Sequence, residues 1–138
     1  MRVWLIALAV ASTLSASAAA GAATGIHRFI GVRGTPNLDC EVAAAVPGLG
    51  TFVYCLSAPT PAKAVSVQMS AAGKLQICRG EKCMSNPPDG EAMLRAGQSV
   101  SAGPFRCTVL KGTNPKVRCL VTKLGHGFQL GPLGLTRL

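Results

Sequence analysis

The chain has 138 residues, of which 14 are Lys or Arg and five are Asp or Glu, so the formal net charge is +9. This length predicts a single domain and excludes a chain of several large ones. Aromatic residues make up only 4% of the sequence, which excludes a core supported mainly by aromatic side chains; we expect the six cysteines to supply the missing support.

Residues 1–23 have the layout of a secretory signal peptide. A short positively charged start precedes an apolar run, residues 3–14, and small residues follow. The apolar run is too short for a membrane-spanning helix, which needs about 20 apolar residues. We expect cleavage within residues 18–23 and a secreted, extracellular domain over residues 24–138; an uncleaved N-terminal anchor is the alternative. No cysteine precedes Cys40, so we do not expect a lipoprotein.

The most regular strand pattern lies in residues 105–121. Apolar and polar residues alternate on both sides of a Lys-Gly-Thr-Asn-Pro segment, which has the composition of a turn. The pattern predicts a β-hairpin with one buried face, and one register places every apolar pair on that face. Its pairs are Cys107 with Cys119, Val109 with Val117, and Phe105 with Val121.

The same alternation predicts two earlier hairpins, over residues 36–56 and 65–78. Their expected pairs are Cys40 with Cys55 and Val42 with Val53, then Met69 with Leu75 and Val67 with Ile77. Further strands are expected at residues 29–32 and at residues 127–131, which we take as the last strand. Residues 91–100 fit either the start of a short helix or a short strand.

No apolar period of 3.6 residues is sustained anywhere in residues 24–138. Short strands separated by turn signals are typical of all-β folds. The sequence therefore predicts a small disulfide-stapled sandwich or partly open barrel that is built from β-hairpins.

All six cysteines lie after the predicted signal peptide, and an even number in a secreted chain favours disulfides. Six cysteines allow 15 complete pairings, among which the cysteine count alone does not choose. The two hairpin registers favour Cys40–Cys55 and Cys107–Cys119. The remaining pair, Cys78 and Cys83, would then close a small loop.

Seven short motifs carry a resemblance to a known family. They are Asn37-Leu38-x-Cys40, Val53-x-Cys55, Gly73 with Cys78-x-Gly80, Leu94-x-x-Gly97-Gln98, Phe105-x-Cys107, Val117-x-Cys119 and Gly125-His126-Gly127-Phe128. Over about residues 29–130 the chain resembles a family of small secreted actinobacterial proteins, a domain of unknown function. The resemblance implies secretion, disulfides and a shared fold, and it brings no activity, substrate or cofactor.

No catalytic residues can be assigned from the sequence. It has no Gly-x-Ser-x-Gly motif, six paired cysteines would leave no free thiol, and His27 and His126 lack metal-ligand spacing. Asp39 and Glu41 could supply the paired carboxylates of a glycoside hydrolase, but a solvated strand face is the favoured interpretation. We therefore predict a protein that is not an enzyme and that uses neither a metal nor a cofactor.

His126 is the polar residue that stands out, because glycines flank it and it shares strand parity with Phe128 and Leu130. We expect its imidazole to be part-buried and hydrogen-bonded to backbone, with the glycines permitting a bulge or the close approach of another strand. The functional alternative is a small ligand pocket formed by Gly125, His126 and Gly127.

Charge is strongly polarised along the chain. Residues 24–91 hold six Lys or Arg and five Asp or Glu, whereas residues 92–138 hold seven Lys or Arg and no acid. Arg106, Lys116 and Arg118 alternate with the apolar positions of the predicted hairpin, so they should share its other face as an anion-binding site. A soluble, repulsive surface is the alternative interpretation.

Three functional hypotheses follow. The first is a non-catalytic envelope or extracellular module that binds an anionic envelope polymer or lipid headgroups. Nucleic acid is a disfavoured partner, because stacking aromatics are missing from the basic hairpin face. The second is an inhibitor or ligand of another secreted protein, and a hydrolase ranks third.

Overall fold

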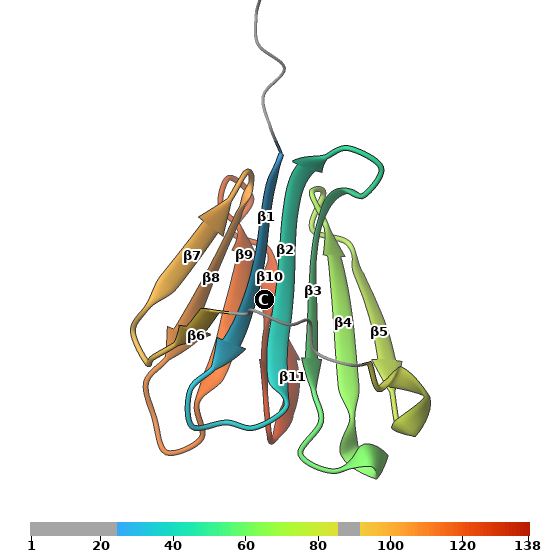
Figure 1. Cartoon of the computed structure of the whole chain (residues 1–138), viewed down its shortest axis with the longest axis vertical. Coiled ribbons are helices and arrows are strands. Elements are labelled where there is room, and N and C mark those ends of the chain that lie inside the picture. The colour runs from blue at the N-terminus through green and yellow to red at the C-terminus, as the bar shows by residue number, and fades with distance from the viewer. Residues whose placement is uncertain (1–24, 86–91) are drawn as a thin grey trace, which may run out of the picture.

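The computed structural model describes residues 25–85 and 92–138, and within these ranges the chain forms two packed β-sheets (Figure 1). The two sheets form a sandwich and not a closed barrel, so the predicted all-β, disulfide-stapled fold class is confirmed. The predicted signal peptide lies outside the described residues.

One sheet has six strands in the order β5-β4-β3-β2-β1-β6, and all its neighbours are antiparallel except β1 and β6. The strands are β1 (Ile26–Val32), β2 (Leu38–Val46), β3 (Gly50–Ser57), β4 (Val65–Ser70), β5 (Leu75–Arg79) and β6 (Ala92–Leu94). Single 3-10 turns follow β3 and β5, η1 (Pro61–Lys63) and η2 (Glu81–Cys83).

The other sheet has five antiparallel strands in the order β11-β10-β9-β8-β7. They are β7 (Ser99–Ala102), β8 (Phe105–Leu110), β9 (Lys116–Val121), β10 (Gly127–Gly131) and β11 (Gly134–Arg137). The expectation that residues 127–131 form the last strand is wrong, because β11 pairs with β10 beyond them.

The three predicted hairpins form with the predicted registers. In the hairpin of β8 and β9, Cys107 faces Cys119, and the flanking apolar pairs lie on the same side. The hairpins β2–β3 and β4–β5 also pair as the alternation predicts. Residues 91–100 were expected to form either the start of a short helix or a short strand. The described part of this stretch contains β6 and the beginning of β7 and no helix.

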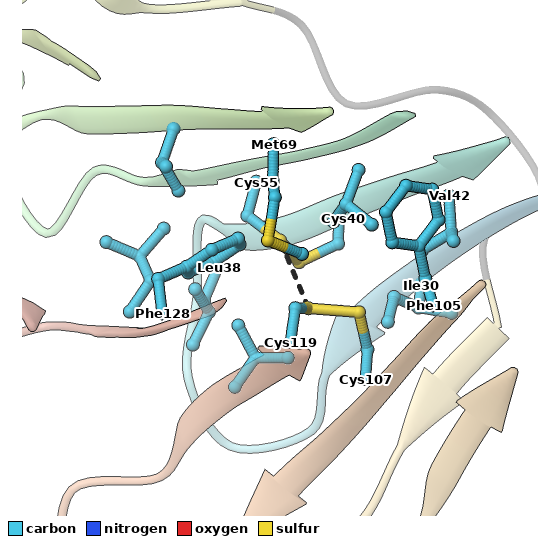
Figure 2. Packing of buried hydrophobic residues seen from close by; sticks show 14 of the residues in the cluster. Ile30, Leu38, Cys40, Val42, Cys55, Met69, Phe105, Cys107, Cys119 and Phe128 are labelled. Carbon is cyan, nitrogen blue, oxygen red and sulfur yellow. Dashed lines mark hydrogen bonds between the residues drawn. A yellow bond between two sulfur atoms is a disulfide. The ribbon is translucent and has the colours of Figure 1, made fainter. Parts of the chain in front are cut away.

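The core lies between the sheets and is filled by the inward residues of both (Figure 2). Phe105 and Phe128 are fully buried and come from the five-stranded sheet, whereas Ile30, Leu38 and Met69 come from the other. Side chains alternate along each strand, so the residues between these point outward. The two outer faces of the sandwich are therefore where the chain presents polar and charged groups.

Three disulfides staple the fold: Cys40–Cys55 within the six-stranded sheet, Cys107–Cys119 within the five-stranded sheet, and Cys78–Cys83 between β5 and η2. These are the pairs predicted from the hairpin registers. The two cross-strand disulfides have Cα–Cα distances of 4.1 Å, as expected for the closer type of antiparallel pair.

Candidate functional site

The outer face of the five-stranded sheet carries the three predicted cations. Arg106 on β8, and Lys116 and Arg118 on β9, occupy positions that alternate with fully buried residues. Residues 92–138 contain no acid, and within the described ranges no carboxylate forms an ion pair with any of the three. We call this outer surface the basic face.

The three cations are staggered and not directly opposite one another. Each faces a neutral residue across the hairpin: Arg106 faces Leu120, Arg118 faces Thr108, and Lys116 faces Leu110. Diagonal neighbours in an antiparallel pair are about 7–8 Å apart. Arg106 and Arg118 are such a diagonal pair, and Lys116 lies two residues from Arg118 along β9. This stagger lowers the mutual repulsion of the three cations.

A small hollow of about 130 Å³ lies beside Lys116 on the basic face. Gln129 and Thr136 line it, together with Gly131, where a Cβ would lie 2.8 Å from that of Lys116. The glycine therefore makes room for the lysine stem. The hollow offers an amide and a hydroxyl next to a lysine, which are donors suited to an oxyanion.

His126 is exposed, so the expectation that its imidazole is part-buried is wrong. The parity argument fails because β10 begins at Gly127 and the chain turns at Gly125, which has a φ of 69°. His126 and Gly127 line an open hollow of about 460 Å³ together with Lys74 and Arg137. Gly125 is not among the described residues that line it, so the predicted three-residue pocket is not formed as a unit.

Gly127 serves close strand packing. A Cβ on this residue would overlap the carbonyl oxygen of Cys119 and lie 2.8 Å from Cδ2 of Leu120. The predicted close approach of another strand is therefore found at Gly127, and the approaching strand is β9.

A larger hollow, which sequence reasoning missed, lies on the outer face of the six-stranded sheet. It has a volume of about 550 Å³. Its walls include three aromatic residues, which lie on β1 and β3. Two carboxylates lie on β2, the strand between these two. These residues are Phe29, Phe52 and Tyr54, with Asp39 and Glu41. We call this hollow the aromatic groove.

Glu41 is held by a neighbour at the edge of the groove. Nε2 of His27 lies 2.8 Å from Oε1 of Glu41, and the His27 ring lies against Phe29 with centroids 4.4 Å apart. Glu41 is 27% exposed, so its carboxylate remains partly open to solvent. The pair fixes where the negative charge sits beside the Phe29 ring.

Three cysteine sulfurs, those of Cys40, Cys55 and Cys119, lie within 4.8 Å of one another in the core. Metal binding by cysteine requires the thiolate. All three sulfurs belong to disulfides here. This cluster is therefore part of the packing of the core.

Comparisons of this chain with protein families, with curated proteins and with solved structures find no match. The resemblance to the actinobacterial family thus stays a prediction from the motifs. Three disulfides are compatible with an extracellular protein. Within residues 25–85 and 92–138, both helices are single 3-10 turns, and neither has the length or the apolar sequence of a membrane span.

Proposed function

We propose that this protein is a secreted, non-catalytic binding module whose basic face holds an anionic polymer of the cell envelope or its surroundings. The single observation behind the proposal is the grouping of Arg106, Lys116 and Arg118 on one sheet face, where no carboxylate of the described residues forms an ion pair with them. Unneutralised cations that share a face raise the local potential and attract polyanions.

The shape of the basic face favours an extended ligand over a small one. The cations lie on two adjacent strands of a sheet, and the hollow beside Lys116, at about 130 Å³, has room for a single anionic group. An extended polyanion could place successive phosphates or carboxylates along such a face and release counterions on binding. Anionic lipid headgroups offer the same chemistry as an alternative partner.

The test is retention of the secreted protein on an anionic polymer column, such as heparin or a teichoic-acid-like polyphosphate, during a salt gradient. Reversing Arg106, Lys116 and Arg118 to Glu should abolish retention at low salt. Retention of the unaltered protein should fall steeply with salt, since exposed charges are screened over about 8–10 Å at physiological ionic strength.

The matched control reverses Lys63, Lys74 and Lys82 to Glu. These lysines are exposed and lie in η1, in the β4–β5 turn and in η2, so none of them is on a strand of the five-stranded sheet. The control makes the same change in net charge and should reduce retention much less. Equal losses from the two triple variants would show that net charge alone governs binding and would contradict the proposal. A third variant with Gln at Arg106, Lys116 and Arg118 separates the loss of attraction from the repulsion that Glu introduces.

A further inference from the structure

The aromatic residues of this chain are distributed unevenly between the core and one surface. Five lie in the described residues, and Phe105 and Phe128 are fully buried. The other three, Phe29, Phe52 and Tyr54, are only half-buried and line the aromatic groove. A chain with few aromatics thus places most of them at the surface, which is typical of a binding site and not of a core.

Negative charge is concentrated in the same place. The described residues contain three acids, and two of them, Asp39 and Glu41, line the groove. The strands of this sheet carry two arginines, Arg28 and Arg79, which are exposed but pair with the inward residues Val42 and Val65. His27 is the basic side chain at an outward position of these strands. The groove therefore combines apolar ring surface with a local negative potential in a chain whose overall charge is +9.

The strand register places a carboxylate between two aromatic rings. Phe29 on β1 pairs with Glu41 on β2, and Glu41 pairs with Tyr54 on β3. Neighbouring strands lie about 4.8 Å apart, so the backbones of Phe29 and Tyr54 are separated by about 10 Å. A group seated midway between the two strands that carry these rings would lie about 5 Å from the line of each strand. This spacing is comparable with the roughly 6 Å over which an aromatic face attracts a cation.

From this arrangement we infer that the aromatic groove binds a small organic cation that carries an alkylated ammonium group. The ammonium would lie between Phe29 and Tyr54 above the Glu41 carboxylate. Methyl groups on the nitrogen contact the rings, and the positive charge is attracted both by the ring faces and by the carboxylate. The groove volume of about 550 Å³ lies within the range of small-molecule sites and has room for substituents beyond the ammonium.

This inference is independent of the proposed function, because the groove and the basic face lie on different sheets. The charge of the ligand is opposite as well. An anionic polymer would be repelled by Asp39 and Glu41, whereas a cation would be repelled by Arg106, Lys116 and Arg118.

The structure supplies its own reporter for the test. Tyr54 is the sole tyrosine of the chain and lines the groove. In protein labelled with [13C]tyrosine, a single ring signal in the NMR spectrum therefore reports on the site. We would titrate this protein with choline and, separately, with 3,3-dimethyl-1-butanol, in which carbon replaces the charged nitrogen in the same shape.

We expect choline to shift the Tyr54 signal saturably and to bind about fivefold or more tightly than the neutral analogue. Glu41→Gln, which removes one negative charge at constant size, should weaken choline binding about threefold or more. Phe29→Leu should weaken it as well, and both variants keep Tyr54 as the reporter. Glu81→Gln is the matched control, since Glu81 is exposed in η2 and should leave the affinity unchanged.

Equal affinity for choline and the neutral analogue would overturn the inference, because the groove would then recognise apolar shape alone. A Tyr54 signal that choline does not shift would also overturn it. Equal effects of Glu41→Gln and Glu81→Gln on choline affinity would overturn the inference too. Thermal melting of each variant excludes loss of the fold as the cause of weaker binding.

Discussion

The Sγ atoms of Cys55 and Cys119 lie 4.0 Å apart at the centre of the sandwich, although each belongs to a different disulfide and a different sheet (Figure 2, dashed line). Both sulfurs are oxidised and carry no hydrogen, so the contact is a van der Waals contact. The two cross-strand disulfides thus stack against each other and join the sheets by packing. Four of the six cysteines have become core residues, each at most 3% exposed.

This contact predicts disulfide exchange when one partner is removed. In Cys40→Ala, the Cys55 thiolate should attack Sγ of Cys119, form Cys55–Cys119 and release Cys107 as a thiolate. Non-reducing peptide mapping after incubation at mildly alkaline pH should find this linkage between the sheets. In the control Cys78→Ala, the freed Cys83 lies in η2 outside the main core cluster and should not exchange. A Cys40→Ala protein that keeps the Cys107–Cys119 disulfide and a free Cys55 would contradict the prediction.

The third disulfide should be reduced first. Cys78 is half-buried, whereas Cys40, Cys55, Cys107 and Cys119 are buried in the core. Because exchange needs access of the attacking thiol, mild reductant followed by alkylation should label Cys78 and Cys83 before the others. The selectively reduced protein should still bind the anionic polymer, since β5 and η2 are not part of the basic face. Labelling of Cys107 or Cys119 at the same rate would show that the core opens more readily than its burial implies.

Gly127→Ala should destabilise the protein strongly. The added Cβ has no space against the carbonyl oxygen of Cys119, so β9 and β10 would have to separate. Overpacking of this kind costs about 1–3 kcal/mol. The neighbouring change His126→Gln, at an exposed position, should alter the free energy of unfolding by no more than about 0.5 kcal/mol. Chemical denaturation of both variants measures the contrast, and similar effects would refute the packing explanation.

Ala45→Gly should stabilise the protein slightly. Ala45 has a φ of 53° and lies at the register shift between β2 and β3, and it is exposed. The left-handed conformation costs an L-residue roughly 1–2 kcal/mol, and the backbone entropy of glycine offsets about 0.5–1 kcal/mol of that gain. The free energy of unfolding, measured by thermal denaturation, should therefore rise by up to about 1.5 kcal/mol. Ala43→Gly, in the regular part of β2, is the control and should destabilise.

The registers and the disulfides could be predicted from the sequence because two independent patterns agree there. Apolar alternation and cysteine spacing give the same pairing for Cys107 with Cys119, and a slip of one residue would turn the whole apolar set outward. The side of the hairpin that carries Arg106 and Arg118 follows from the same alternation. The position of His126 did not follow, because alternation holds only within a strand and β10 begins one residue later.

The aromatic groove could not be predicted because it depends on the lateral order of strands. Phe29 is distant from Tyr54 in sequence, and the two rings flank Glu41 only because β2 lies between β1 and β3. Local patterns give the face of each side chain but not which strands are neighbours. The same reason explains why the parallel pairing of β6 with β1 was missed.

The placement of opposite charges on the two outer faces has a consequence for orientation. Outward carboxylates lie on one sheet and outward Arg and Lys on the other, with stacked sheets about 10 Å apart. The sandwich is therefore an electric dipole across its thin dimension. A molecule adsorbed on an anionic surface aligns with that field and settles on its five-stranded sheet. Phe29, Phe52 and Tyr54 then face the surrounding medium, so each adsorbed copy would display its groove to passing solutes.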